Sequence, residues 1–299
     1  MMKIQNKEGF DRDFTYQWNA EWKEEDTDKP ILKITKSSVG QFDWCPKKYE
    51  FGYIDRKPQD TSEAMHNGTL VHNALEEFYN VFDIKKAETM DNKEVTEYMF
   101  SLFPIDNMSE MYETLSINEA QRFMVAKKDK TLEDFLPVIN EVTLDAQITI
   151  HRADYPKFPL KRDYVIHLQG IIDRMFVDKN GYIPMELKTG AWKEYKKTMM
   201  RKEMAYYKLI FDNCPIEQLE AIGLSRDKQI THWGWRYPAS NLIYVEEQKK
   251  SSHKALMRSI VKLIKAYEDN SFPTKYNART CSYCSYLDIC DGGADEGWL

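Results

Sequence analysis

Residues 170–190 read GIIDRMFVDKNGYIPMELKTG, and this stretch decides the fold. Two apolar runs rich in residues that favour strands flank the dipeptide Asn180-Gly181. Asn-Gly between such runs is the strongest short-range sign of a two-residue type I′ turn, in which both central residues take positive φ. The stretch is therefore expected to form a β-hairpin with Asn180 and Gly181 as its loop.

The predicted hairpin places its charged side chains on one face. With its loop at that dipeptide, Asp173 lies opposite Lys188, and Glu186 lies two residues from Lys188 and so on the same side. Met185 and Leu187 point to the other side, as core. Because charged groups gathered on one face of an apolar hairpin are costly for a purely structural element, a function for them has to be considered.

An aspartate, a glutamate and a lysine in this arrangement suit metal-assisted hydrolysis of a phosphodiester bond. Two carboxylates, Asp173 and Glu186, can bind a hard divalent cation through oxygen, and the cation lowers the pKa of its bound water. The ammonium group of Lys188 can orient that water or offset developing charge. The alternative is a solvated strand face or a cross-strand ion pair worth under ~1 kcal/mol.

The spacing of these residues resembles a known motif. Asp173, followed after twelve residues by Glu186-x-Lys188, is similar to the PD-(D/E)XK nucleases. Gly170-Ile-Ile-Asp173 together with Glu186-Leu-Lys-Thr-Gly190 is similar to their RecB-like branch. The resemblance implies that Asp173 and Glu186 bind Mg²⁺ or Mn²⁺ and that Lys188 is catalytic.

The composition is that of an ordinary globular chain. It has 299 residues, 42% hydrophobic and 13% aromatic, enough for one large core or two modest ones. The net charge of −6 argues against nonspecific coating of nucleic acid, although local charge matters more than the total. The first residues lack the apolar run of a signal peptide, and no run of eighteen apolar residues occurs. We expect a cytoplasmic protein with no membrane contact.

The N-terminal part contains an extension and a helix that carries one cysteine. Residues 1–35 are polar and charged, and no role is assigned to them. Ser37 or Ser38 is a suitable N-cap, and apolar residues follow at helical spacing to Cys45 and beyond. The segment resembles the opening motif of the RecB-like nucleases that carry an iron–sulfur cluster, including AddB and the CRISPR-associated exonucleases. Without that resemblance, Cys45 would be interpreted as a buried apolar cysteine.

A histidine motif and a helical insert follow. Gly68-x-x-x-His72-x-x-Leu-Glu76 lies in a segment of helical periodicity. A lone helical histidine is usually a packing or surface residue, but this motif is similar to one in the same branch whose imidazole ligates the catalytic metal. His72 is therefore a candidate metal ligand. Residues 84–138 indicate several helices, and the resemblance makes them a variable insert.

The sheet is expected to begin at Ile139. Apolar and polar residues alternate from Val142 to Ile150, the period of a strand with one buried face. Glu141 stands where many relatives place an acidic residue, although on its own it is simply a polar strand position. Residues 164–177 form the next strand, which leads into the hairpin.

A basic and aromatic run follows the hairpin. Within residues 191–208 six basic side chains outnumber two acidic ones, with aromatic residues between them. Such a mixture suits the phosphates and bases of a single strand, although a solvated helix face is the ordinary interpretation. In the family a Gln-x-x-x-Tyr motif occupies this helix, and here Glu203 replaces the glutamine. A carboxylate repels phosphate, so Glu203 is not expected to face DNA. The candidate DNA contacts are Lys193, Lys196, Lys197, Arg201, Lys202 and Tyr207.

The C-terminal part carries three cysteines in ten residues, Cys281-Ser-Tyr-Cys284-Ser-Tyr-Leu-Asp-Ile-Cys290. In a cytoplasmic chain such a group favours metal ligation over disulfides. Structural zinc prefers two Cys-x-x-Cys pairs, and only one pair is present here. The layout, with Cys45 as fourth ligand, resembles the iron–sulfur staple of the AddB-like and CRISPR-associated exonucleases. The resemblance implies a 4Fe-4S cluster, with Zn²⁺ as the alternative, and leaves Cys214 for packing.

These features predict an α/β fold of the PD-(D/E)XK restriction-endonuclease-like type. One nuclease domain over residues 36–299 would have a mixed central sheet flanked by helices, with a cluster-binding tail at 281–290. The resemblance implies an Mg²⁺- or Mn²⁺-dependent deoxyribonuclease that acts as an exonuclease on single-stranded DNA ends in repair, recombination or CRISPR-type processing. Its partner would be a helicase, a recombination protein or a CRISPR adaptation protein. The alternative is a DNA-binding or assembly module of a recombination or spacer-acquisition complex with little cleavage of its own.

Overall fold

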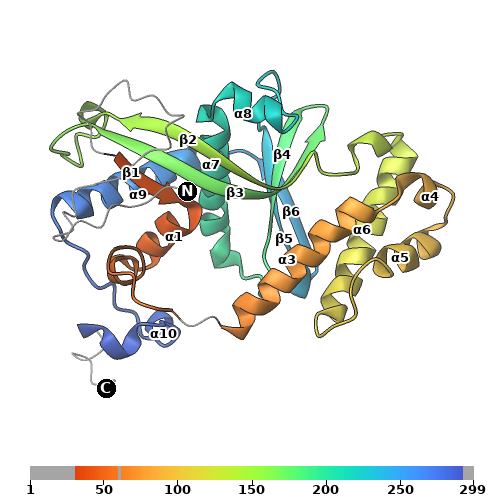
Figure 1. Ribbon diagram of the computed structural model, residues 1–299, viewed down its shortest axis with the longest axis horizontal. Helices are drawn as coiled ribbons and strands as arrows, with labels where there is room; N and C mark the ends of the chain where they lie inside the picture. The colour runs from red at the N-terminus through yellow and green to blue at the C-terminus, as the bar shows by residue number, and fades with distance from the viewer. Residues whose placement is uncertain (1–30, 60–61, 292–299) are drawn as a thin grey trace.

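The computed structural model describes residues 31–59 and 62–291 (Figure 1). The strands are β1 (Ile31–Thr35), β2 (Ile139–Ile150), β3 (Tyr164–Asp178), β4 (Gly181–Leu187), β5 (His232–Tyr237) and β6 (Leu242–Glu247). The α-helices are α1 (Lys36–Trp44), α2 (Pro46–Tyr49), α3 (Glu63–Val81), α4 (Ile84–Glu88), α5 (Asn92–Phe100), α6 (Ser109–Asp129), α7 (Lys197–Asn213), α8 (Ile216–Ala221), α9 (Lys250–Glu268) and α10 (Ala278–Cys281). Among the described residues, none of the helices is both long and apolar enough to cross a membrane.

The long strand β3 organises a mixed sheet in the order β1-β3-β4-β5-β6, and β2 also pairs with β3. β2 runs antiparallel along most of β3, and its alternating burial confirms the predicted period of two. The other edge of β3 is shared by two strands. β1 runs parallel to its first half, and β4 runs antiparallel to its second half.

The shared edge brings two strand ends together. β1 ends at Thr35, opposite Gln169, and the pairing of β4 with β3 ends at Met185, opposite Arg174. Because one strand is parallel and the other antiparallel to β3, their C-terminal ends point toward each other. Side chains that follow these two ends therefore converge beside Asp173.

Two apolar cores hold the helices against the sheet. One core joins the sheet to α1, α7 and α9, and the other joins the β3–β4 hairpin to α3, α5 and α6. The helices α4, α5 and α6 form the lobe at the right of Figure 1, in agreement with the helical insert predicted for residues 84–138. Met185 and Leu187 lie in the second core, as the hairpin pattern predicted.

Gly170 explains the close approach of α7 to the sheet. A Cβ atom at this position would lie 2.8 Å from Ile210 Cδ1 and 3.3 Å from the Tyr206 ring, both on α7. A larger residue would require the Ile210 side chain to change its position and the Tyr206 ring to give way slightly. The glycine that opens the hairpin motif thus leaves room for the α7 side chains that pack against the strand carrying Asp173.

The domain begins earlier than predicted. Residues 31–35, assigned to the N-terminal extension, form β1 inside the central sheet, and residues 1–30 lie outside the described part of the chain. The helix that follows is capped by Thr35, whose side chain accepts a hydrogen bond from the Ser38 N–H group, and not by Ser37 or Ser38. Lys36 consequently becomes the first helical residue, directly after the strand end.

Candidate active site

The hairpin forms, but its loop lies one residue earlier than predicted. Asp178 pairs with Gly181, so Lys179 and Asn180 are the two loop residues. Asp178 Oδ1 accepts hydrogen bonds from the backbone N–H groups of Asn180 (2.7 Å) and Gly181 (3.0 Å) and holds this loop. Gly181 has φ of +149°, and a Cβ atom there would lie 2.2 Å from the Gln229 carbonyl oxygen. Glycine is required because it begins β4 in close contact with that backbone.

The earlier loop changes the cross-strand partners and leaves the faces unchanged. Arg174 pairs with Met185, and extending this register puts Asp173 opposite Glu186, where the sequence predicted Lys188. Moving a hairpin loop by one residue shifts the register by two. Because side chains alternate with a period of two, Asp173, Glu186 and Lys188 remain on one face.

The two carboxylates of the motif are buried and differ in acidity. Asp173 is 8% exposed and Glu186 is 2% exposed. Asp173 Oδ2 accepts a hydrogen bond from the Leu187 N–H group at 3.0 Å. Burial, and then the neighbouring charge of Glu186, raise the pKa of Asp173. Burial opposes ionisation of Glu186 as well, but Lys36 and Lys188 outweigh it and hold its pKa below the usual range.

Lys188 contacts two carboxylates. Its Nζ atom lies 2.7 Å from Glu186 Oε1 and 3.0 Å from Glu203 Oε2. Burial lowers the pKa of this ammonium group, but the charges of Glu186 and Glu203 outweigh burial, so that the pKa of Lys188 is raised. Lys188 is therefore protonated at neutral pH and can act as a cation and hydrogen-bond donor, and not as a general base.

Lys36 is a second lysine at this site, and the sequence reasoning missed it. Its Nζ atom lies 2.6 and 2.7 Å from the two carboxylate oxygens of Glu186 and donates to Tyr207 Oη at 2.6 Å. Lys36 and Glu186 are 150 residues apart in the sequence. The available signal was a lysine directly after the apolar run Ile31–Thr35, which can be recognised only once that run is identified as a strand of the sheet.

The Glu203-x-x-x-Tyr207 segment of α7 faces the centre of the site. Tyr207 is fully buried and its hydroxyl group donates to Glu186 Oε2. The predicted contact of Tyr207 with DNA is therefore wrong in this structure, because the tertiary fold covers the ring and the carboxylate takes the hydroxyl. Glu203 lies 3.0 Å from Lys188, and that it does not face DNA stays a prediction.

His72 approaches from α3. Its Nε2 atom lies 3.2 Å from the Leu187 carbonyl oxygen, which can only accept, so this nitrogen carries the proton. The other ring nitrogen, Nδ1, lies 3.5 Å from Glu141 Oε1 and 3.8 Å from Asp173 Oδ2. Glu141 has φ of +54°, and the pairs on either side of it place it opposite Asp173.

The side chains gathered here are of the kind that hard divalent cations prefer. Asp173, Glu186 and Glu141 supply carboxylate oxygens and His72 supplies a ring nitrogen. Over residues 31–59 and 62–291, no three such side chains are already arranged as a formed metal site, and Glu186 is held by the two lysines. The chemistry of the donor set nevertheless fits Mg²⁺ or Mn²⁺.

Acidic residues from other elements neutralise part of the predicted basic run. The Arg201 guanidinium group donates two hydrogen bonds to the Glu246 carboxylate, at 2.6 and 2.5 Å. Burial opposes ionisation of Glu246, but these hydrogen bonds prevail and hold its pKa at about 2. Lys202 forms an ion pair with Asp43 on α1. In this structure Arg201 and Lys202 therefore have protein partners in place of DNA.

The N-terminal part of the run is more open. Lys193 is exposed, the Lys196 ammonium group donates to the Ala191 carbonyl oxygen at 2.6 Å, and Lys197 lies 3.1 Å from Glu194. Exposed contacts of this kind are weak and exchange readily with water. These lysines stay candidate DNA contacts.

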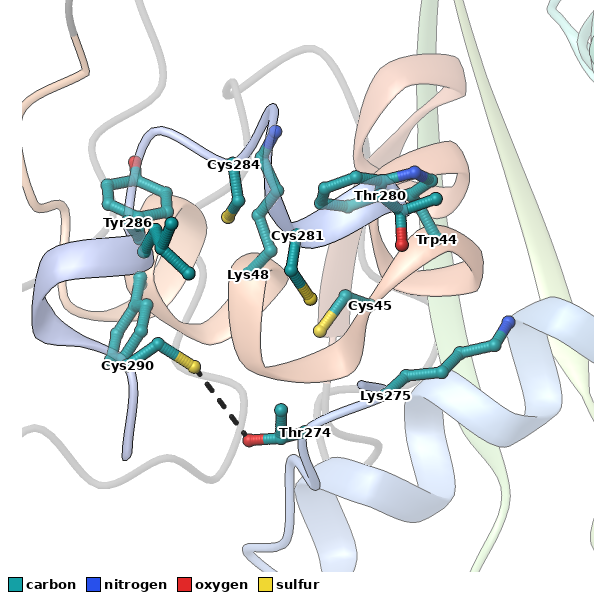
Figure 2. A pocket seen from close by; sticks show the side chains of 12 residues that line it. Trp44, Cys45, Lys48, Thr274, Lys275, Thr280, Cys281, Cys284, Tyr286 and Cys290 are labelled. Atoms are coloured by element: carbon teal, nitrogen blue, oxygen red, sulfur yellow. Dashed lines mark hydrogen bonds between the residues drawn. The ribbon is translucent and has the colours of Figure 1, made fainter. Parts of the chain in front are cut away.

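The four cysteines predicted to bind a cluster converge on one cavity (Figure 2). Cys45 lies at the break between α1 and α2, where Pro46 begins the second helix. Cys281 ends α10, and Cys284 and Cys290 follow in the tail. Burial raises the pKa of the Cys284 thiol, and the neighbouring cysteines raise it further. Cysteines from the two ends of the described chain thus share one site.

Cys214 is separate from this group. It is buried in the core that joins the sheet to α7 and α9, and burial raises the pKa of its thiol to about 11. An apolar, protonated thiol is a packing residue. This agrees with the role expected from the sequence.

Comparison with known proteins identifies the family. The crystal structure of the protein SSO0001 is similar at 12% identity, with a TM-score of 0.38 over 87% of each chain. A candidate exonuclease from Eubacterium rectale is similar at 10% identity, with a TM-score of 0.39 over 89% of each chain. No curated protein matches the sequence. Residues 33–291 match the PD-(D/E)XK nuclease superfamily, and the chain belongs to that superfamily.

Proposed function

We propose that this protein is a metal-dependent deoxyribonuclease whose catalytic centre is the end of the β3–β4 hairpin. The observation that supports this most strongly is the common face of Asp173, Glu186 and Lys188, with Lys188 Nζ 2.7 Å from Glu186. Two buried carboxylates next to each other repel and are costly in a structural hairpin. A divalent cation between them would remove that cost.

Each residue has a distinct part in the proposed reaction. Asp173 and Glu186 would hold Mg²⁺ or Mn²⁺, with His72 as a further ligand through Nδ1. The bound cation would polarise the phosphate and supply a nucleophilic water. Lys188, as a permanent cation, would orient that water and offset the charge that develops on the phosphate. The hydrogen bond from the Leu187 N–H group fixes the Asp173 carboxylate for this task.

We assign the chain to the RecB-like branch and propose exonuclease action on single-stranded DNA ends. The order of its motifs supports this: a cysteine, a histidine, the catalytic hairpin and a cysteine-rich tail follow one another. Lys193, Lys196 and Lys197 would contact the DNA backbone next to the hairpin. Repair, recombination or CRISPR-type processing is the setting in which such an activity is used, with a helicase, recombination or adaptation protein as partner.

The activity test is degradation of single-stranded DNA labelled at one end, with Mn²⁺ present. Wild type is compared with Lys188→Ala and with Lys265→Ala, a matched control that removes a lysine paired with Glu268 and Asp269 on α9. We expect cleavage by wild type and the control and none by Lys188→Ala, with all three folded. The fate of the label gives the polarity.

The alternative function, a DNA-binding or assembly module, has one observation in its favour. Glu186 is held by Lys36, Lys188 and Tyr207, and Glu203 stands where the family has glutamine. DNA that is bound and left uncut by wild type in the same assay would support this alternative and direct the search to a partner.

We further propose a structural 4Fe-4S cluster at the four-cysteine cavity, with Zn²⁺ as the alternative metal. A cluster there would join α1 to the C-terminal tail and restrict the unfolded chain. Anaerobically purified protein should be brown, whereas a zinc site is colourless. Cys284→Ala should lose colour and solubility, and Cys214→Ala should keep its colour. A soluble, folded and colourless Cys284→Ala protein would contradict a structural cluster.

A further inference from the structure

Lys36 occupies a position that no motif of this chain assigns. It is the first residue of α1 and directly follows β1, so the junction of these two elements delivers its side chain to the strand ends beside Asp173. Its side chain is only 16% exposed, and its ammonium group spans both carboxylate oxygens of Glu186. Lys36 also lines a groove of about 370 Å³, together with Lys188 and Glu203.

The two lysines and two glutamates form a closed arrangement of alternating charge. Lys36 contacts Glu186 at 2.6 Å and Glu203 at 3.9 Å. Lys188 contacts the same two carboxylates, at 2.7 and 3.0 Å. The four formal charges cancel. The negative charge left to hold a divalent cation then comes from Asp173, with Glu141 nearby.

This balance depends on both members of the pair Lys36 and Glu203. If Glu203 were neutral, the group would carry one surplus positive charge next to the carboxylates that would bind metal. If Lys36 were neutral, Glu186 and Glu203 would share one lysine, and a surplus negative charge would face the groove through which a phosphate approaches. A buried charge without a partner is costly in either case.

We propose that Lys36 is a positioning residue for Glu186 and that its charge is matched to Glu203. This inference rests on the proposed function, because it takes Glu186 as a metal ligand. Lys36 holds the Glu186 carboxylate in a fixed orientation beside Tyr207. Glu203 neutralises the charge of Lys36. The net charge of the centre is therefore the same as it would be with neutral residues at positions 36 and 203.

The test is a double-mutant cycle with Lys36→Met, Glu203→Gln and the double variant, made in the full chain and purified anaerobically. Calorimetry measures the dissociation constant of Mn²⁺, with Asp173→Asn defining the heat that belongs to this site, and nuclease assays measure kcat. We expect Lys36→Met to bind Mn²⁺ roughly tenfold more tightly and Glu203→Gln roughly tenfold more weakly, because each changes the local charge by one unit. The double variant should return to within about threefold of wild type.

Activity should follow the same non-additive pattern. Lys36→Met should lower kcat at least about tenfold, and adding Glu203→Gln should restore the part of the loss that comes from surplus charge but not the part that comes from the lost orientation of Glu186. Lys36→Arg, which keeps the charge, should retain wild-type Mn²⁺ affinity and provides a second variant if Lys36→Met folds poorly. A matched cycle uses Lys265→Met and Asp269→Asn, which remove an ion pair at 2.9 Å at the C-terminal end of α9. It should show no effect on Mn²⁺ affinity or kcat.

Two results would overturn the proposal. One is Mn²⁺ affinity that is the same in Lys36→Met, Lys36→Arg and wild type. The other is an effect of Lys36→Met on kcat that is equally large in the wild-type protein and in the Glu203→Gln variant. If wild type binds Mn²⁺ and cuts no DNA, the proposed nuclease function fails, and the Mn²⁺ affinities of the four proteins still decide whether Lys36 and Glu203 are matched.

Discussion

Two groups of buried charges flank the second core, and they are built differently. In the first, Glu119 of α6 is fully buried and lies 2.8 Å from Arg122 and 2.6 Å from Arg236 of β5. Arg236 also donates to the Tyr79 hydroxyl group at 3.3 Å. In the second, Glu186 and Glu203 face Lys36 and Lys188, with the Asp173 carboxylate beside them.

The difference lies in the sign of the surplus charge. Glu119 is one carboxylate served by two guanidinium groups, which overcome burial and hold its pKa at about 2. At the hairpin the carboxylates outnumber the lysines, and burial with Glu186 raises the pKa of Asp173. A buried group with surplus negative charge suits a cation and costs stability, whereas one carboxylate held by two guanidinium groups leaves no negative charge for a cation. The two groups therefore differ in whether their charge favours binding of a cation.

The largest effect should come from Asp173→Asn. The amide keeps the hydrogen bond from Leu187 and removes one buried negative charge, so activity in Mn²⁺ should fall roughly 10²- to 10³-fold. Stability should rise by about 1 kcal/mol because the repulsion with Glu186 is lost. Nuclease assays and urea denaturation measure the two quantities. A variant that loses both activity and stability would show that Asp173 has a structural role.

Glu119→Gln should give the opposite result. It leaves Arg122 and Arg236 without a charged partner in a buried site, and should cost about 3 kcal/mol of unfolding free energy. Nuclease activity of the folded variant should stay close to wild type. Glu113→Gln, an exposed position on the same helix, is the control and should change stability little. Strong loss of activity in folded Glu119→Gln would end the distinction between the two groups.

The pH dependence of stability should identify the Glu119 group. The pKa of Glu119 is lowered from 4.5 to about 2, so the unfolded chain binds the proton first as pH falls. The stability that Glu119 contributes is thus fully present above pH 4.5 and is lost as pH falls toward 2. Urea denaturation of wild type and Glu119→Gln at several pH values should show their difference shrinking over this window. A constant difference would contradict the assignment.

The smallest effect should come from Arg201→Gln. The Arg201 side chain is 23% exposed to solvent, which screens the pair, so the pair should contribute about 1 kcal/mol. Because Arg201 is paired with Glu246, Arg201→Gln should change the dissociation constant for single-stranded DNA less than Lys193→Gln changes it. Fluorescence anisotropy at fixed salt compares the two variants. A larger effect of Arg201→Gln would restore it as a DNA contact.

Local patterns in the sequence predicted the parts of the site that depend on neighbouring residues. The alternation of side chains places Asp173, Glu186 and Lys188 on one face whichever of the two loops forms, and it sends Met185 and Leu187 to the core. The loop itself was missed because the Asp178 side chain, and not the Asn-Gly dipeptide, holds the turn.

What the sequence determined by itself is the charged face of the hairpin and the helices of residues 84–138, since spacing and period carry that information. The grouping of Cys45 with the three C-terminal cysteines came only from the resemblance to a family. Only the tertiary structure decided that Lys36 reaches Glu186, that Tyr207 is covered and that Glu246 and Asp43 neutralise Arg201 and Lys202. The physical reason is that these contacts join residues far apart in the chain. Their geometry depends on how β1 and β4 meet along β3, and no local period encodes that meeting.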